Sequence, residues 1–185
     1  MSRPAVFFDR DGTLMRDVDF ASRSEQVELL PGAADAVRSL SAAGWVVVLV
    51  TNQSGIGRGL FSPDDYDRVH ARLVELLAAE GVRLNAAYHC PHAAEVQCDC
   101  RKPGIGLFER AAREHDLDLP RSWCIGDRWR DVAPAQALGA TGLLVPSDAT
   151  PSDDRQRARE ADLLAPSLAE AVQRVQRDGS AKRDG

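Results

Sequence analysis

Acidic side chains stand in two short motifs of this sequence where their spacing favours metal chemistry. Asp9 and Asp11 lie two residues apart in FFDRDGTL, and Asp127 and Asp131 lie four apart in IGDRWRD. Neighbouring carboxylates repel each other unless a cation or a shared proton intervenes. Each motif follows an apolar run that predicts a buried strand, and in a parallel sheet the ends of these strands share one rim. The sequence therefore predicts an oxygen-rich site suited to Mg²⁺ on that rim, although either motif alone would also fit an ordinary turn.

A third polar motif, TNQSG, follows the β-branched run WVVVLV. Thr51 ends the predicted strand and is followed by Asn52, Gln53 and Ser54. A hydroxyl and several main-chain N–H groups at a strand end can hold phosphate oxygens. The glycines of this stretch do not have the spacing G-x-G-x-x-G, so a dinucleotide site is set aside. An ordinary loop is the remaining alternative.

Three cysteines and a histidine gather in CPHAAEVQCDC. Cys90, His92, Cys98 and Cys100 have the spacing C-x-H-x₅-C-x-C. Zinc takes thiolate and imidazole ligands tetrahedrally, and a site with four protein ligands is closed and structural. A redox pair would need the spacing C-x-x-C, which is absent, and three unrelated buried thiols are the other alternative. The pattern predicts a structural zinc loop over residues 90–101.

Short apolar runs alternate with longer amphipathic segments along the chain. The runs predict strands over 5–9, 45–51, 86–90, 123–127 and 142–145. The segments predict helices over 33–44, 62–81, 106–116, 131–139 and 167–177. This alternation is typical of an α/β fold with a doubly wound, Rossmann-like parallel sheet. Ligands of such sheets bind beyond the carboxyl ends of the strands, which is where the polar motifs lie.

Composition narrows the class of protein. The 185 residues are 44% hydrophobic, which suits one domain over 1–177 followed by a disordered tail over 178–185. The net charge of −5 speaks against a general nucleic-acid binder, whose surface is basic. No run is apolar enough for a signal peptide or a membrane span. We therefore expect a cytoplasmic protein without nucleic-acid or membrane partners.

The ordered set of motifs resembles a known family. DRDGTL, TNQSG, RKP and GDRWRD, in this order, resemble the four motifs of the haloacid dehalogenase (HAD) superfamily of phosphatases over residues 5 to 145. With CPH…CDCRKP inserted, the chain is similar to the branch that contains heptose bisphosphate phosphatases and histidinol-phosphatases. The resemblance implies a HAD-type domain with a minimal cap, a small phosphorylated substrate, a monomer, and zinc at the four Cys/His positions.

The resemblance also implies catalytic roles. Asp9 matches the nucleophile that forms an aspartyl-phosphate, and Asp11 matches the general acid and base. Mg²⁺ would be held by the Asp9 side chain, the Asp11 main-chain carbonyl and Asp127. Thr51 and Lys102 match the residues that bind the phosphoryl group.

Further positions match residues that contact substrate in this branch. They comprise a loop after the first strand, the TNQS motif and two arginines. These residues are Asp17, Val18, Asp19, Phe20, Asn52, Gln53, Ser54, Arg101 and Arg128. For Arg128 a surface salt bridge is the alternative interpretation.

The motifs leave several functions open. Hydrolysis of D-glycero-D-manno-heptose 1,7-bisphosphate to heptose 1-phosphate is the leading expectation, because TNQSGIGRG resembles that group closely. Histidinol-phosphatase is the alternative within the branch. A polynucleotide 3′-phosphatase shares the DGT and TNQ-GI-RG patterns, but the acidic chain and the zinc loop argue against it. A non-catalytic module would not need all the motif residues.

Overall fold

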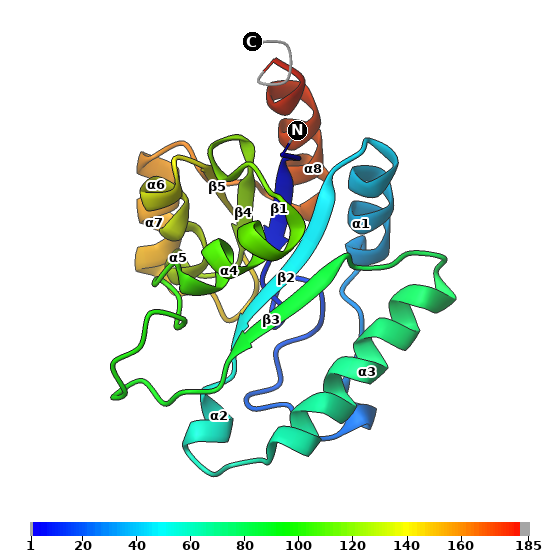
Figure 1. Ribbon diagram of the computed structural model, residues 1–185, viewed down its shortest axis with the longest axis vertical. Helices are drawn as coiled ribbons and strands as arrows, with labels where there is room; N and C mark the ends of the chain where they lie inside the picture. The colour runs from blue at the N-terminus through cyan, green and yellow to red at the C-terminus, as the bar shows by residue number, and fades with distance from the viewer. Residues whose placement is uncertain (1, 182–185) are drawn as a thin grey trace.

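A five-stranded parallel sheet forms the centre of the molecule (Figure 1). The computed structural model describes residues 2–181. The strands are β1 (Ala5–Phe8), β2 (Val46–Asn52), β3 (Ala86–Cys90), β4 (Trp123–Gly126) and β5 (Thr141–Leu144). Their order is β3-β2-β1-β4-β5, and every neighbouring pair is parallel. The predicted doubly wound parallel sheet is confirmed.

Helices connect the strands. The α-helices are α1 (Ala33–Ala42), α2 (Ser54–Gly57), α3 (Pro63–Ala79), α4 (Gly106–His115), α5 (Trp129–Val132), α6 (Pro134–Leu138), α7 (Ser152–Glu160) and α8 (Leu168–Ala181). Two 3₁₀ turns, η1 (Ser24–Gln26) and η2 (Leu119–Arg121), complete the elements. Within residues 2–181 none of the helices combines the length and the apolar character that crossing a bilayer requires.

Some helices differ from those that the sequence predicts. The helix expected over 131–139 is divided into α5 and α6, because Pro134 has no N–H to continue the first helix. Helix α7 has only one buried residue, Ala158, so it carries no apolar periodicity that could reveal it. Helix α8 continues to Ala181 instead of ending at 177, so the predicted disordered tail is wrong over 178–181. Its remainder, 182–185, lies outside the described residues.

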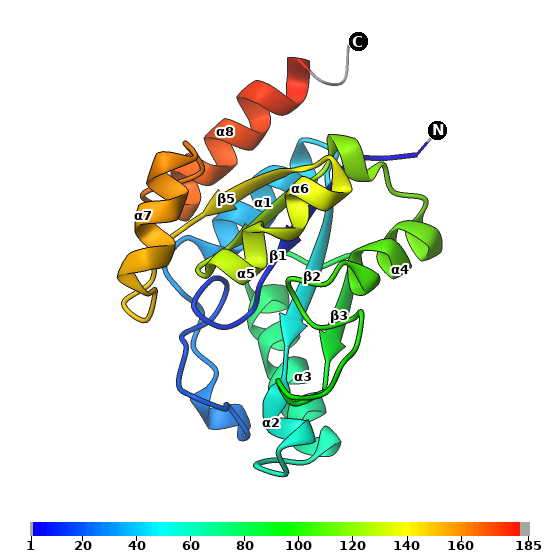
Figure 2. The ribbon, with the colours of Figure 1, turned by 90° about the vertical axis from the view of Figure 1, so that its left-hand side faces the viewer.

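The two faces of the sheet bury alternate residues of each strand. In β1, Val6 and Phe8 face the cluster formed with α1, α3 and α8. Ala5 and Phe7 face the cluster formed with α4 and α6. Figure 2 shows α8 and α4 on opposite sides of the sheet. Burial on both faces explains why β1 is uniformly apolar in sequence.

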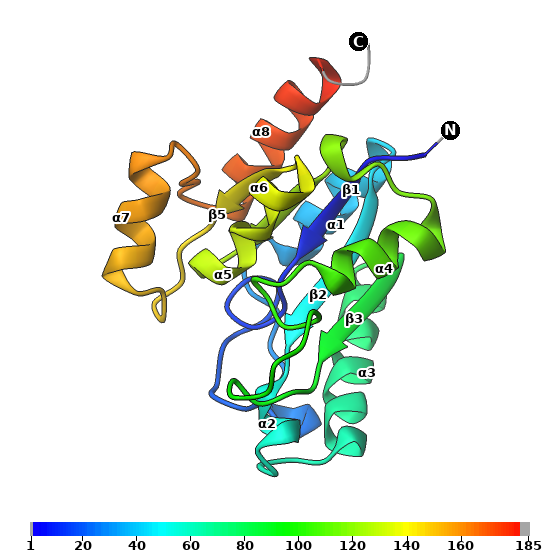
Figure 3. The same ribbon diagram turned by 60° about the vertical axis from the view of Figure 1, so that its left-hand side comes forward.

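The rim at the carboxyl ends of the strands is assembled from long connections. The main-chain N–H of Asp9 donates to the carbonyl of Ile125 at 2.9 Å, which extends the pairing of β1 and β4 to the first acid. Figure 3 shows the segment between β3 and α4 lying beside the end of β2. These connections bring the polar motifs of distant strands together.

Candidate active site and metal centre

A buried cluster of three carboxylates and one ammonium lies on this rim. Asp9 follows β1, and Asp127 and Asp131 follow β4; one carboxylate oxygen from each lies within 4.8 Å of the other two. The Nζ of Lys102 is 2.8 Å from an oxygen of Asp9 and 2.8 Å from one of Asp131. The exposed fractions of all four residues are 6% or less. The sequence predicted that Asp131 lies on this rim but did not indicate that it pairs with Lys102.

The three carboxylates of this cluster lie close enough to repel one another. Burial alone would lower the pKa of Lys102, but Asp131 and Asp9 outweigh it and raise the pKa, so the ammonium stays charged. Burial raises the pKa of Asp127 to about 7, an effect that Ser147 opposes and the nearby Asp9 and Asp131 reinforce. Arg128 lies 3.4 Å from Asp127, and Arg130 lies 4.0 Å from Asp131. Three buried carboxylates that offer oxygens within 4.8 Å of one another are a donor set of the kind that divalent cations bind. The donor set therefore fits Mg²⁺.

Asp127 is oriented by a segment that follows β5. The Ser147 hydroxyl donates to Oδ2 of Asp127 at 2.6 Å. The Thr150 hydroxyl donates to the Asp127 main-chain carbonyl at 2.7 Å. Sequence reasoning missed both residues, because PSDAT has no spacing that distinguishes it from a polar loop. Such contacts fix the rotamer of a metal-binding carboxylate.

The main chain of Lys102 is anchored to the end of β2. Asn52 donates its amide N–H to the Lys102 carbonyl at 3.0 Å, and the Lys102 N–H donates to Asn52 Oδ1 at 2.9 Å. The Lys102 ammonium also donates to the Val50 carbonyl at 2.7 Å. The Asn52 side chain, which the resemblance assigns to substrate, is thus engaged with Lys102.

Asp11 lies in a second network on the same rim. Gln53 donates its amide N–H to Asp11 Oδ2 at 2.8 Å and to Thr51 Oγ1 at 2.9 Å. The guanidinium of Arg10 contacts the Asp11 carboxylate at 3.1 Å. Burial raises the pKa of Asp11, an effect that Arg10 opposes and Asp9 reinforces. Asp11 is therefore paired with Arg10, whereas Asp9 and Asp131 are paired with Lys102.

A cavity of about 220 Å³ opens onto these groups. Its lining residues come from three rim loops and are Asp9, Arg10, Asp11, Asp17, Asp19, Phe20, Ala21, Thr51, Asn52, Gln53, Ser54, Arg128 and Arg130. Most of the residues that the resemblance assigns to substrate thus share one cavity. Lys102 and Asp127 are buried beside it and do not line it.

Two of the expected substrate residues lie elsewhere. Val18 packs against the hydrophobic core instead of lining the cavity. Arg101 donates to the His92 carbonyl at 3.3 Å. Arg128 does line the cavity, and its guanidinium lies 3.4 Å from Asp127 and 3.7 Å from Asp17. Arg128 therefore forms ion pairs at the cavity, one with the buried Asp127 and one with the partly exposed Asp17.

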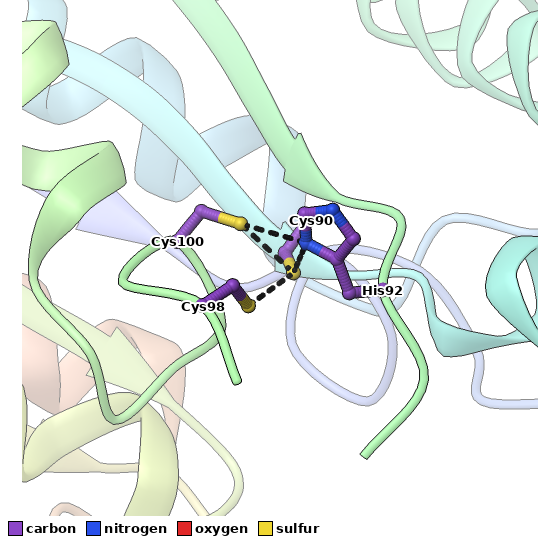
Figure 4. A group of neighbouring side chains, drawn as sticks. All are labelled: Cys90, His92, Cys98 and Cys100. Carbon is purple, nitrogen blue, oxygen red and sulfur yellow. Dashed lines mark hydrogen bonds between the residues drawn. The ribbon is translucent and has the colours of Figure 1, made fainter. Parts of the chain in front are cut away.

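The Cys/His segment forms a compact group of four side chains (Figure 4). The Sγ of Cys90 lies 3.2 Å from that of Cys100 and 3.8 Å from that of Cys98, and His92 Nδ1 lies 3.2 Å from Cys100 Sγ. All four potential ligand atoms lie within 4.8 Å of one another. A tetrahedral zinc ion with bonds of about 2.3 Å holds two sulfurs about 3.8 Å apart. The Cys90–Cys98 distance matches this value, and the Cys90–Cys100 distance is shorter. The type and the proximity of the four donors therefore fit a zinc site.

The chemistry of the four donors also calls for a cation. Burial and the neighbouring thiols of Cys90 and Cys98 raise the pKa of Cys100 to about 12. Burial also raises the pKa of Cys90. Three thiols this close cannot all ionise unless a positive ion joins them. No disulfide links them, and each is a free cysteine.

The zinc loop is fixed to the rim at both ends. The N–H of Gln53 donates to the Cys90 carbonyl at 2.7 Å, and the N–H of Gly57 donates to the Pro91 carbonyl at 2.8 Å. A Cβ at Gly57 would lie 2.6 Å from the main-chain nitrogen of Ala93, so only glycine allows this approach. At the other end, the N–H of Gly106 donates to the Asp99 carbonyl at 3.0 Å.

Two family models match the chain. The model described as Polynucleotide kinase 3 phosphatase matches residues 4–130, and the HAD-hydrolase-like model matches residues 99–171. Together they span the acidic motifs and the Cys/His group. The fold and the site thus define a HAD-type phosphohydrolase.

Similar proteins narrow this class. A relative from Thermosynechococcus vestitus, named D-glycero-D-manno-heptose-1,7-bisphosphate 7-phosphatase, is 41% identical and matches over 94% of this chain and 95% of that protein. A Haemophilus ducreyi protein, named D-glycero-beta-D-manno-heptose-1,7-bisphosphate 7-phosphatase, is 35% identical over 93% of this chain and 98% of its own length. The chain belongs to the family of the D-glycero-D-manno-heptose-1,7-bisphosphate 7-phosphatases, as its motifs predicted.

A solved structure supports the same relationship. The crystal structure of D,D-heptose 1.7-bisphosphate phosphatase from B. bronchiseptica, complexed with magnesium and phosphate, has a TM-score of 0.82 and 31% sequence identity. The match covers 95% of this chain and 99% of that chain. The HAD-type fold is therefore confirmed.

Proposed function

We propose that this chain is a magnesium-dependent phosphatase that hydrolyses D-glycero-D-manno-heptose 1,7-bisphosphate to heptose 1-phosphate. The observation that carries the proposal is Asp9, held beside Lys102 and two further acids where the cavity meets the strand ends. The curated relatives named for this activity support the choice of substrate.

The reaction proceeds in two steps. A carboxylate oxygen of Asp9 attacks phosphorus, the bond to the sugar oxygen breaks, and Asp11 gives its proton to that leaving oxygen. Asp11 then takes a proton from water, which attacks the aspartyl-phosphate and releases inorganic phosphate. Lys102 and the Thr51 hydroxyl neutralise and orient the phosphoryl oxygens. Asp9, Asp127 and the Asp11 main-chain carbonyl would hold Mg²⁺, whose charge lets one anion approach another.

Zinc has a structural part in this proposal. Cys90, His92, Cys98 and Cys100 would give zinc four protein ligands, which is the ligand number of a structural site. The last ligand is separated from Lys102 by a single residue. Zinc bound there would fix the segment that carries Lys102, the residue that binds the phosphoryl group in this proposal.

A polynucleotide 3′-phosphatase is the second candidate, because a family model of that description matches residues 4–130. A nucleic-acid substrate is disfavoured by the net charge of −5, and the curated relatives favour the sugar phosphate. Histidinol phosphate is the third substrate to compare. The cytoplasmic location, the monomeric state and a single domain over 1–177 stay predictions.

The decisive experiment compares kcat/KM for heptose bisphosphate, histidinol phosphate and a 3′-phosphorylated oligonucleotide. The proposal expects the highest value for heptose bisphosphate, with activity lost on removal of Mg²⁺. A higher value for either other substrate would replace the proposed substrate. Turnover of none of them by folded, metal-loaded protein would overturn the proposed function.

A further inference from the structure

Arg10 is a buried cation that the reaction described above does not use. It stands between Asp9 and Asp11 in the first motif. Its exposed fraction is 1%, and among residues 2–181 it is the largest of the fully buried side chains. A buried guanidinium is costly unless its charge and its N–H groups are satisfied. Its partners should therefore indicate what it does.

The principal charged partner of Arg10 is Asp11. Its Nε lies 3.2 Å from both carboxylate oxygens, and its Nη2 lies 3.1 Å from Oδ1. On the other side, the guanidinium carbon lies 5.4 Å from the centre of the Tyr66 ring, which helix α3 supplies. The planar guanidinium is confined by the ring and binds the carboxylate through two nitrogens. These contacts restrict rotation of the Asp11 carboxylate.

Gln53 extends this restraint to the phosphoryl-binding side. Arg10 Nη2 donates to Gln53 Oε1 at 3.0 Å, which orients the amide. The amide N–H then donates to Asp11 Oδ2 and to Thr51 Oγ1 at 2.8 and 2.9 Å. Asp11 is thus fixed relative to the threonine on the neighbouring strand.

We propose that Arg10 is a positioning residue which, together with Gln53, aims the Asp11 carboxyl group at the leaving oxygen of the substrate. This inference rests on the proposed function and deepens it. In the first step the Asp11 proton passes to the sugar oxygen as the bond from that oxygen to phosphorus breaks. A poorly aimed Asp11 carboxyl group slows this proton transfer. Attack by Asp9 is slowed with it only when the leaving group must be protonated, so a leaving group that needs no proton should be released at the normal rate.

Substrates whose leaving groups differ in basicity can show whether Arg10 positions Asp11 or only stabilises the fold. Arg10→Lys keeps the charge but loses the planar two-nitrogen grip, and Gln53→Met removes the amide without changing any charge. Arg68→Lys, on the exposed face of α3, is the matched control. Each variant is loaded with magnesium and zinc, and its fold is checked by circular dichroism. Single-turnover rates are then measured with heptose bisphosphate and with 2,4-dinitrophenyl phosphate, whose phenolate leaves without a proton.

We expect Arg10→Lys and Gln53→Met to slow release of heptose phosphate by roughly 10²-fold, the lower end of the usual contribution of general acid catalysis. The first burst of dinitrophenolate should stay within about threefold of the unmodified enzyme, because it needs no proton. Arg68→Lys should change neither rate. Gln53→Met keeps the test decisive if Arg10→Lys does not fold.

Equal loss of both rates in the folded variants would overturn the inference, and so would unchanged release of heptose phosphate. These outcomes differ from failure of the proposed function, in which the unmodified enzyme itself would form no phospho-enzyme from heptose bisphosphate.

Discussion

The carboxamide of Asn52 and the main chain of Lys102 form a closed pair of hydrogen bonds, 3.0 and 2.9 Å long. The pair joins the last residue of β2 to the residue that carries the buried ammonium, fifty positions later in the chain. Lys102 is therefore located by its main chain as well as by its ion pairs with Asp9 and Asp131.

Asn52→Ala tests this anchor. The change leaves an N–H and a carbonyl of Lys102 without partners, which costs about 1–3 kcal/mol for each buried group, and it lets the ammonium move. We expect kcat/KM for heptose bisphosphate to fall more than tenfold, with loss of unfolding free energy in urea. Asn85→Ala is the matched control, because Asn85 accepts from the Val47 N–H near the start of β2. That variant should lose stability but keep kcat/KM, and equal losses of activity in both would contradict the anchor.

Asp9→Asn tests the nucleophile. An amide cannot form the acyl-phosphate, so phosphate release should fall below detection, a loss of at least about 10³-fold. The far-ultraviolet circular dichroism spectrum should stay unchanged, because the main-chain bond from Asp9 to Ile125 does not involve the side chain. Asp64→Asn, in the first turn of α3, is the control for removal of one acid. Normal turnover by Asp9→Asn would rule out the assignment.

Zinc removal tests the structural metal. Cys98→Ser or a zinc chelator should lower the melting temperature and weaken binding of inorganic phosphate, because the loop would no longer hold Lys102. Elemental analysis should find one zinc per chain in the unmodified protein. Cys124→Ala is the control, since Cys124 is buried in β4 apart from the group of four. Its zinc content should be unchanged, and a zinc-free, fully active native enzyme would disprove the metal site.

The pH dependence of stability should report the burial of His70. Burial lowers the pKa of this imidazole, and the nearby Arg10 and His89 lower it further. The folded protein thus keeps His70 neutral below about pH 6.5, where the unfolded chain takes up a proton. The unfolding free energy should fall as the pH drops from 6.5, by no more than about 1.4 kcal/mol per pH unit from this group. Urea titrations from pH 7 to 5 should show a shallower fall for His70→Gln; an identical fall would refute this cause.

The sheet and much of the site could be predicted because each depends on local sequence. Strands buried on both faces read as apolar runs, and the acids at their ends, such as Asp9 and Asp127, share a rim in any parallel sheet. The partners of those acids could not be predicted in this way. Nothing in the motif spacing distinguishes Arg10, and nothing distinguishes Ser147 from other residues of a polar loop, since their contacts with Gln53 and Asp127 join distant parts of the chain.

The two expected substrate residues that lie elsewhere have the same explanation. Motif position alone cannot show that Val18 turns toward the core or that Arg101 is drawn to the His92 carbonyl. Helix α7 escaped prediction for a different reason, because its polar sequence offers no buried stripe.

The central place of β1 in the sheet has a consequence for synthesis on the ribosome. β1 pairs with β2 on one side and with β4 on the other, so a nascent chain that ends before residue 123 exposes one edge of its first strand. Such a chain contains Asp9 and Asp11 but lacks Asp127 and the Ile125 carbonyl that receives the Asp9 N–H. Pairing of the second edge of β1 and the meeting of Asp9 with Asp127 therefore both wait for β4, and until then that edge is open to association with other chains.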